Sequence, residues 1–366
     1  MFKMYSFKNY RIRLCLYVIA ITVIGIMVVG SARNSLQDRQ VFGMALGICC
    51  MFILSLFDYS FLLKLVWPAY FVNIALLVAV ILKGTESHGQ SRWLDIGPVQ
   101  FQPSELSKIV IIMFFAAFFM RYQEQISTFR ALAVSAVLIA IPLGLVLKSD
   151  LSTTIVTTLI FITLLFVAGI SYKIIGGAAA ICIPAVIVVL YLIMQPDQEI
   201  IKGYQLKRIL AWRYPQKYPD GAYQQQNSIM AIGSGQLWGK GLNNNNFDSV
   251  KNGNFISEPH TDFIFSVAGE ELGFVGAATI IILLTLIALE CVLIGRKAKD
   301  LAGRLICCGM AALIGFQSFV NISVTTGLLP NTGLTLPFVS YGLTSLVTLY
   351  IGIGIVLNVG LQPKKY

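Results

Sequence analysis

The sequence predicts an all-α integral membrane protein with about ten membrane-spanning helices. Hydrophobic residues make up 57% of the 366 residues and charged residues only 12%, and the mean hydropathy is +0.77. Apolar runs of roughly 16 to 25 residues recur along the chain, and runs of that length cross a bilayer core as helices. A transmembrane β-barrel would show short segments of alternating polarity instead. The composition therefore favours a polytopic helical membrane protein.

The apolar runs extend over nearly the whole chain, so residues 1–366 are predicted to form a single membrane domain. The first run, which ends in VVGSARN, resembles a signal peptide, but the spans that follow it favour a retained first helix. The ten predicted spans are approximately 14–31, 41–57, 66–82, 105–120, 131–147, 153–169, 174–194, 263–293, 303–328 and 344–361.

Basic residues indicate how the chain is oriented in the membrane. Lys and Arg are concentrated in the short connections on one side, and the positive-inside rule places that side in the cytoplasm. Both termini are therefore predicted to be cytoplasmic. The same rule explains much of the net charge of +10, so we expect no nucleic acid partner. The cysteines mostly fall inside apolar runs, where they are predicted to be small core residues.

Residues 195–262 form one large loop between the seventh and eighth predicted spans, and the orientation places this loop outside the cell. Its first part reads KGYQLKRILAWRYP, which alternates basic and aromatic residues like a helix that lies on the membrane surface. Most of the loop is equally consistent with a solvated cover that takes no part in chemistry.

Polar residues cluster just before the fourth predicted span, in the segment SRWLDIGPVQFQPSELSK. Pro103 suits the first turn of a helix, and Ser104 and Glu105 suit its positive end. Glu105 and Lys108 are three residues apart and so share a helical face. They form either an intrahelical ion pair of structural value or a charged pair that faces a substrate cavity.

Three further segments place polar groups or irregular backbone beside apolar runs. Asp150, in KSDLSTT, either caps the next helix or belongs to a site. Asp262, in FISEPHTDFIF, precedes the eighth span, and Glu270 follows it on roughly the same helical face. The segment LLPNTGLTLPFVSYGLTS contains two prolines and two glycines, and such irregular backbone occurs at membrane depth only when it is packed in protein or lines a cavity.

These segments resemble the motifs of the SEDS family of bacterial shape, elongation, division and sporulation proteins. The matching stretches are RWLDIGPVQFQPSELSK, EPHTDFIFSVAGEELGFVG and GLLPNTGLTLPFVSYG, and they occur in the family's order. The resemblance covers nearly the whole chain and implies a SEDS fold, which is similar to GT-C glycosyltransferases. The length and short termini are most similar to the elongation branch, RodA, while the division and sporulation branches, FtsW and SpoVE, remain open.

The resemblance implies a peptidoglycan glycosyltransferase that joins lipid II into β-1,4-linked glycan strands on the outer face of the bacterial cytoplasmic membrane, for wall elongation and cell shape. It implies Asp262 as the catalytic base. Positive charge for the leaving pyrophosphate is expected from Lys108, Arg92 and Lys240. Glu105 would orient Lys108 or help to bind a divalent cation such as Mg²⁺ or Mn²⁺, for which no ligand set is assigned.

The further candidate residues for substrate binding come from the same motifs. His260 either tunes Asp262, contacts sugar or makes hydrogen bonds within the loop. The full set of candidates for substrate contact is Arg92, Trp93, Gln102, Ser104, Glu105, Lys108, Asp150, Lys240, Glu258, His260, Thr261, Ser340 and Tyr341.

The sequence departs from the family pattern in two places. KSDLSTT retains Asp150 but lacks the family's Gln, Pro and Gly, and in SYGLTS Leu343 replaces a glycine. Both changes affect local geometry near expected substrate contacts. The family also implies a partner, a class B penicillin-binding protein with transpeptidase activity, within the elongation or division machinery. The alternative functions are a lipid II flippase, which broken helices and intramembrane charges also suit, and a structural scaffold.

Overall fold

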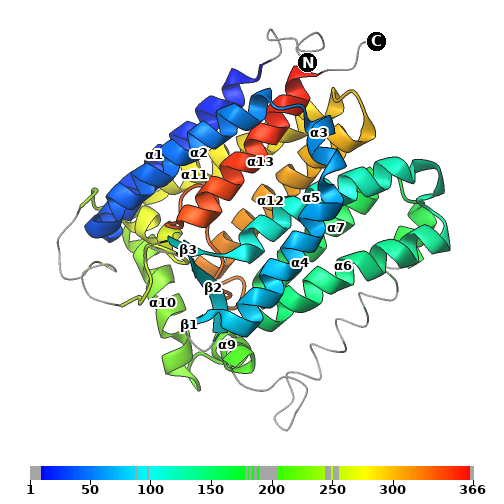
Figure 1. Cartoon of the computed structure of the whole chain (residues 1–366). Helices are drawn as coiled ribbons and strands as arrows, with labels where there is room; N and C mark the ends of the chain where they lie inside the picture. Colours follow the sequence, from blue (N-terminus) through cyan, green and yellow to red (C-terminus); the bar gives the residue numbers. More distant parts are fainter. Residues whose placement is uncertain are drawn as a thin grey trace.

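The computed structural model describes residues 10–87, 90–96, 99–177, 204–243 and 255–362, together with single positions at 180, 184, 188 and 249. Long helices dominate this part of the chain (Figure 1). The long helices are α1 (Ile12–Ala32), α2 (Gln37–Leu56), α4 (Val66–Lys83), α5 (Pro103–Arg121), α6 (Phe129–Ser149), α7 (Leu151–Val167), α11 (Ile264–Arg296), α12 (Leu301–Thr325) and α13 (Leu343–Leu361), and the short helix α3 covers Tyr59–Lys64.

The helical membrane fold predicted from the sequence is confirmed. Eight of the described helices are long and apolar enough to cross a membrane, and α7 is a shorter apolar helix. Each predicted span other than 174–194 coincides with one of these helices. Most of the predicted span 174–194 lies outside the described residues. The total of ten spans and the cytoplasmic termini therefore remain predictions.

Burial separates the central helices from the peripheral ones. Protein covers 72% of the apolar window of α5 and of α13 and 67% of that of α12, but only 22% of that of α6. Close backbone contacts accompany the packing of α1. A Cβ atom on Gly25 would lie 2.8 Å from the Phe338 carbonyl oxygen, so only glycine lets α1 approach the segment before α13 this closely. That segment forms part of the site described below.

A small antiparallel sheet, which the sequence analysis did not predict, precedes α5. Its strands are β1 (Thr85–Ser87), β2 (Gln90–Ile96) and β3 (Val99–Phe101), and their order in the sheet is β1-β2-β3. Trp93 pairs with Thr85, and Leu94 pairs with Phe101. The sheet was missed because its strands are short and lie in a segment that was interpreted as a polar connection between two spans. It fixes the position of Arg92 and Trp93.

The large loop contains two helices, α9 (Tyr204–Arg213) and α10 (Pro219–Ser234). The helix predicted in KGYQLKRILAWRYP is therefore present as α9. The second helix, α10, is not a solvated cover, because it packs against α11 and α12. Ser228 of α10 lies 2.5 Å from the hydroxyl of Ser266 and donates to the Thr325 carbonyl at 2.6 Å.

Helix α11 is broken at Gly273, whose backbone angles are φ 66° and ψ −165°. The loop after α10 fills the break: the backbone N–H of Phe274 donates to the Gln236 carbonyl at 2.8 Å, and that of Lys240 donates to the Glu270 carbonyl at 2.9 Å. Lys240 Nζ also lies 2.8 Å from Glu270 Oε1. We call residues 236–241 together with Glu270 and Gly273 the kink clamp.

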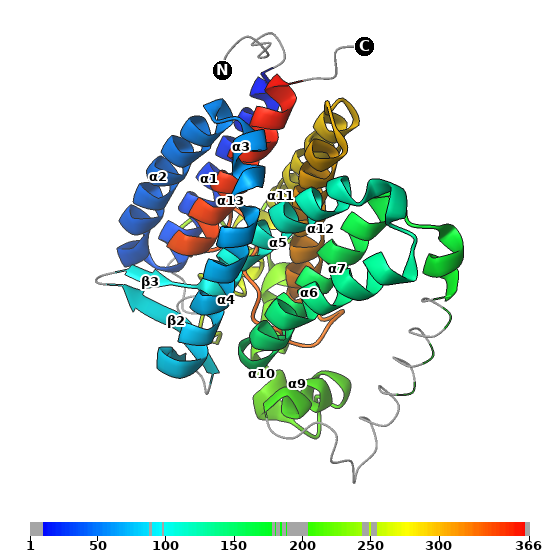
Figure 2. The same cartoon turned by 45° about the vertical axis from the view of Figure 1, so that its right-hand side comes forward.

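The bundle has two dissimilar ends. The start of α1 and the end of α13 lie together at one end, whereas the sheet, α9 and α10 lie at the other (Figures 1 and 2). The irregular segment between α12 and α13 also reaches the end that carries the sheet. All three motif segments named above therefore meet at one end of the bundle.

Candidate active site

A cavity of about 1030 Å³ opens at the end of the bundle that carries the sheet. Its walls come from α2, β2, β3, the start of α5, the start of α7, α9, α10, the turn before α11 and the segment before α13. The lining residues are Asp38, Arg39, Phe42, Arg92, Trp93, Asp95, Gln100, Gln102, Glu105, Asp150, Thr153, Arg208, Gln224, Ser257, Glu258, His260, Thr261, Asp262, Phe263, Asn331, Gly333, Leu334, Thr335, Tyr341, Gly342, Leu343 and Ser345.

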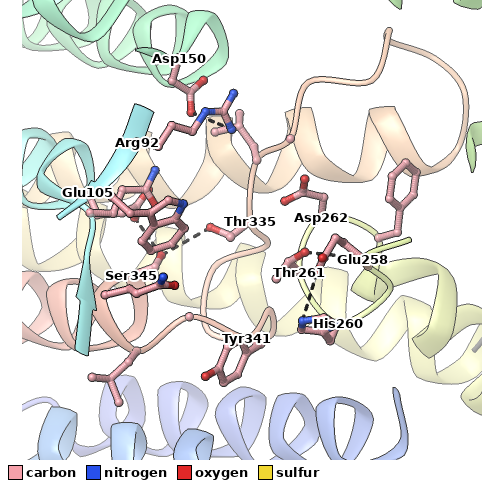
Figure 3. A pocket seen from close by; sticks show the side chains of 18 of the residues that line it. Arg92, Glu105, Asp150, Glu258, His260, Thr261, Asp262, Thr335, Tyr341 and Ser345 are labelled. Atoms are coloured by element: carbon pink, nitrogen blue, oxygen red, sulfur yellow. Dashed lines mark hydrogen bonds and ion pairs between the residues drawn. The ribbon is translucent and has the colours of Figure 1, made fainter. Parts of the chain in front are cut away.

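Asp262 stands in the turn just before α11, and its side chain faces the cavity opposite Glu105 (Figure 3). Asn321 of α12 fixes the turn by donating to the Asp262 carbonyl at 2.9 Å. Burial raises the pKa of the Asp262 carboxyl to about 6, although the charges of Arg92 and Arg208 oppose that rise. The carboxylate is therefore ionised at neutral pH and takes up a proton more readily than an exposed one.

Arg92 and Asp150 form a pair at the wall of the cavity (Figure 3). Arg92, on β2, donates from Nε to the Ser149 carbonyl at 3.1 Å, and its Nη1 lies 3.7 Å from Asp150 Oδ2. Asp150 Oδ1 accepts from the backbone N–H groups of Ser152 at 2.9 Å and Thr153 at 3.0 Å. Asp150 therefore caps α7 with one oxygen and faces the cavity and Arg92 with the other.

Arg208 is a lining residue that the sequence analysis missed. It donates from Nη1 to the Asn331 carbonyl at 3.1 Å, and Trp212, one turn later on α9, donates from Nε1 to the Gly327 carbonyl at 2.8 Å. Burial lowers the pKa of Arg208 to about 10, which leaves the guanidinium charged at neutral pH. The signal in the sequence was the spacing of Arg208 and Trp212, which places both on one face of a helix.

Glu105 and Lys108 form a sealed ion pair at the floor of the cavity. Lys108 Nζ lies 2.8 Å from Glu105 Oε1 and 2.7 Å from Gln317 Oε1, and Ser345 donates to Glu105 Oε2 at 2.8 Å. Glu105 lines the cavity, whereas Lys108 is only 1% exposed and lies beneath it. In this arrangement Lys108 serves as a counterion for Glu105 and does not present its charge to the cavity.

The turn that holds Asp262 is tied to the segment before α13. Ser340 donates from Oγ to the Thr261 carbonyl at 2.7 Å, and the Tyr341 N–H donates to the His260 carbonyl at 2.9 Å. His260 is buried, and its Nε2 lies 3.2 Å from Glu258 Oε2. Burial lowers the pKa of His260, while Glu258 raises it. His260 thus makes local contacts within the loop, which is one of the three roles that its sequence position left open.

The structure brings most of the candidate residues to one cavity. Those that line it are Arg92, Trp93, Gln102, Glu105, Asp150, Glu258, His260, Thr261, Asp262 and Tyr341. Ser104, Lys108 and Ser340 are buried next to it, and Lys240 lies in the kink clamp, paired with Glu270. Lys240 was expected near the leaving group because of its positive charge. The sequence does not show that its partner is Glu270.

The cavity does not by itself form a metal site. Among the residues that the structure describes, no group of three or more His, Cys, Asp or Glu side chains is placed to hold a metal ion. Magnesium and manganese prefer several oxygen ligands, so a divalent cation would have to take most of its ligands from outside the protein.

Sequence comparison identifies the family. A model of cell cycle proteins of the FtsW, RodA and SpoVE type matches residues 9–365. The chain belongs to this family. Among curated members of the family, it is 36% identical to the probable peptidoglycan glycosyltransferase FtsW of Nitrosomonas europaea, over 81% of this chain and 77% of that protein. It is 34% identical to the peptidoglycan glycosyltransferase MrdB of Escherichia coli K12, over 95% of this chain and 93% of that protein.

Solved structures of the family share the fold. One comes from a study of the structural coordination of polymerization and crosslinking by a peptidoglycan synthase complex. It superposes with a TM-score of 0.77 at 30% identity, covering 96% of this chain and 97% of that one. The crystal structure of the rod shape determining protein RodA of Thermus thermophilus gives a TM-score of 0.68 at 29% identity, covering 96% of each chain.

Proposed function

We propose that this multi-pass membrane protein is a peptidoglycan glycosyltransferase that polymerises lipid II at the outer face of the bacterial cytoplasmic membrane. Membership of the family and the names of its relatives support the reaction class. The observation that carries the proposal is Asp262, a carboxylate of pKa about 6 on the wall of a cavity of about 1030 Å³. A cavity of this size accommodates a sugar substrate with its polar groups engaged.

The reaction replaces one C–O bond by another. The 4-hydroxyl of one lipid-linked disaccharide attacks the anomeric carbon of a second, the bond from that carbon to the diphosphate breaks, and its electron pair leaves with the phosphate oxygen. Asp262 takes the hydroxyl proton in the transition state, for which a pKa slightly below the working pH is suited. Inversion at the anomeric carbon gives the β-1,4 bond.

The departing diphosphate needs positive charge, and arginines supply it in this cavity. The lining includes Arg39 and Arg92, whose guanidinium groups can bind phosphate oxygens with two parallel N–H donors. Lys108 and Lys240 are each engaged in an ion pair away from the lining. We therefore assign the role first expected of the lysines to arginines.

A transpeptidase partner fits the proposal. One structural relative comes from a peptidoglycan synthase complex in which polymerization and crosslinking are coordinated. We propose that this chain likewise works with a class B penicillin-binding protein, which crosslinks the strands that the cavity produces. Relatives named FtsW and relatives named MrdB both match the chain. We therefore propose wall elongation as its cellular process, with cell division as the alternative.

The test is to incubate the purified protein, together with its partner, with lipid II in detergent and to measure glycan strands. Flipping cannot yield strands there, because detergent micelles have no second leaflet, so the assay separates a polymerase from a flippase or a scaffold. We expect wild-type protein to make strands and Asp262→Ala to make none while it still inserts and binds its partner. Strand formation by Asp262→Ala at the wild-type rate would refute the catalytic assignment.

A further inference from the structure

Gly333 holds a position between the carboxylate of Asp262 and two arginines. A Cβ atom at Gly333 would lie 3.2 Å from Asp262 Oδ2, 3.5 Å from Arg92 Nη1 and 3.8 Å from Arg208 Nη1. The three charged groups therefore converge around a single point. Gly333 has a φ of +73°, which glycine adopts without strain. The absent side chain leaves no methyl group between the carboxylate and the guanidinium groups.

The two arginines reach this point from separate parts of the chain, and each is held in place. Arg92 is fixed on β2 by the Ser149 carbonyl and by Asp150. Arg208 is fixed on α9 by the Asn331 carbonyl, two residues before Gly333. Trp212 anchors the same helix to the Gly327 carbonyl. The position of Arg208 thus depends on how α9 docks on the segment that contains Gly333.

The charges around Asp262 act in opposite directions. Burial favours its protonated form, and so do the neighbouring carboxylates of Asp150 and Glu258. Arg92 and Arg208 favour the ionised form, and they are the opposing positive charges. Arg92 comes from β2 and is also paired with Asp150 at 3.7 Å, whereas Arg208 is brought to this point by α9 of the large loop. A base must be ionised before it can accept a proton.

We propose that Arg208 is a positioning residue that acts on Asp262 across Gly333, keeping the carboxylate in its charged, base-competent form. This inference rests on the proposed function in so far as Asp262 is the base. It assigns to α9, and hence to the large extracellular loop, a direct role in activating the site. Movement of α9 away from residues 327–333 would lower the fraction of ionised Asp262.

The first experiment compares pH–rate profiles of strand formation for wild type and Arg208→Gln. We expect the midpoint of the acid limb near pH 6 in wild type and about one pH unit higher in Arg208→Gln, because an opposite charge at this range shifts a carboxyl by roughly that amount or more. The variant should lose about fivefold in rate at pH 6, because the ionised fraction falls from about one half to about one tenth, and it should recover at high pH. A purely structural defect would lower the rate at every pH.

Two matched variants control for charge and for helix integrity. Arg208→Lys keeps the charge and should hold the midpoint close to that of wild type. Arg213→Gln removes one positive charge from an exposed position on the same helix, outside the cavity lining, and should leave both midpoint and rate unchanged. A KM increase in Arg208→Gln without any change in midpoint would overturn the proposal in favour of substrate binding.

A second pair of variants tests the role of the glycine. Gly333→Ala introduces a methyl group beside Asp262 Oδ2 and should also raise the midpoint. Gly327→Ala carries the same backbone strain, since its φ is +81°, but its Cβ would contact Ile229 instead. It should lower thermal stability without moving the midpoint. Equal midpoints in the two alanine variants would contradict the proposal.

A readout independent of catalysis separates this inference from the proposed function. Hydrophobic carbodiimides react with protonated carboxyls, so labelling of Asp262, followed by mass spectrometry across pH, reports its protonation directly. Labelling should extend to higher pH in Arg208→Gln than in wild type. If wild type makes no strands but the labelling shifts, the proposed function fails and the electrostatic role of Arg208 stands. If labelling is the same in both proteins, the role of Arg208 is refuted whatever the activity.

Discussion

Two charged clusters flank the first half of α11, and they differ in how tightly their members are paired. In the kink clamp, Lys240 and Glu270 meet at 2.8 Å, and backbone groups of the loop complete the hydrogen bonds that the break at Gly273 leaves open. In the cavity, the Arg92–Asp150 pair is held at 3.7 Å and Asp262 faces open space.

The difference separates structural charges from reactive ones. A charge that is fully engaged by protein groups has little left with which to act on a substrate, whereas a carboxylate at a cavity wall keeps its capacity to exchange a proton. Both clusters contain a carboxylate within or just before α11, eight residues apart. Their sequence contexts are therefore similar, and only the partners that the fold supplies distinguish them.

The largest effect is expected for Asp262→Asn. Loss of a general base lowers turnover by roughly 10²- to 10⁴-fold. Stability should respond in the opposite sense. The raised pKa means that wild type loses stability as pH rises through about 6, because the folded protein must then bury a charge, whereas below about pH 4 the carboxyl is protonated in both states. Thermal unfolding in detergent should show Asp262→Asn at least as stable as wild type at pH 7.5.

A pH-independent difference in unfolding temperature between Asp262→Asn and wild type would contradict this account. Glu270→Gln provides the contrast, because its carboxylate is already paired with Lys240. Glu270→Gln should lower the unfolding temperature and leave the midpoint of the acid limb of the pH–rate profile unchanged.

The next effect tests the sealed pair at the cavity floor. Lys108→Met leaves the buried Glu105 carboxylate without its cation, which typically costs about 3–5 kcal/mol. The double variant Lys108→Met, Glu105→Gln removes both charges and should recover most of the loss. Denaturant titration of the detergent-solubilised protein measures both. Wild-type stability in the single variant would show that Lys108 is not the structural counterion of Glu105.

A smaller loss is expected from the kink clamp. Gly273 has backbone angles that essentially only glycine adopts, and a Cβ there would press on the backbone N of Gly239. Gly273→Ala should therefore cost about 1–3 kcal/mol. The acid limb of the pH–rate profile should keep its wild-type midpoint in the protein that folds, because none of the charges around Asp262 changes. A shift of the midpoint would show that the two clusters are coupled.

The smallest effect is expected for Lys240→Gln. The amide still donates to the ionised Glu270 Oε1, so an ion pair is replaced by a hydrogen bond from a neutral donor. Because the Lys240 side chain is 30% exposed, the cost should be about 1 kcal/mol. Strand formation should stay near the wild-type rate, since Lys240 lies outside the cavity lining. A large rise in KM would instead place Lys240 in contact with substrate.

The helices were predictable because a bilayer imposes a length and a composition on any segment that crosses it. The sequence located α4 at 66–82, and the structure has it at Val66–Lys83. It also identified Asp262 and Glu105 through motifs that keep several polar residues in fixed order beside apolar runs. The structure brings these two carboxylates to opposite sides of one cavity.

Other members of the site escaped prediction for identifiable reasons. Arg208 lies in a loop that reads as an amphipathic surface helix, and nothing local shows that α9 turns this residue toward Asp262. The β2 strand was missed because short paired strands depend on neighbours that the chain supplies only after folding. Lys240, by contrast, was expected near the leaving group because its charge suits that role, whereas the structure pairs it with Glu270 at 2.8 Å outside the cavity lining.

The sequence by itself determined that the protein crosses the membrane repeatedly and which polar motifs stand at the ends of its helices, because hydrophobic length and residue order are local properties of the chain. Only the tertiary structure decided which of those charges face the cavity and which are paired within the protein. Electrostatic character depends on distances between residues such as Arg208, Gly333 and Asp262, which are remote in sequence and become neighbours only when α9 docks on the segment before α13.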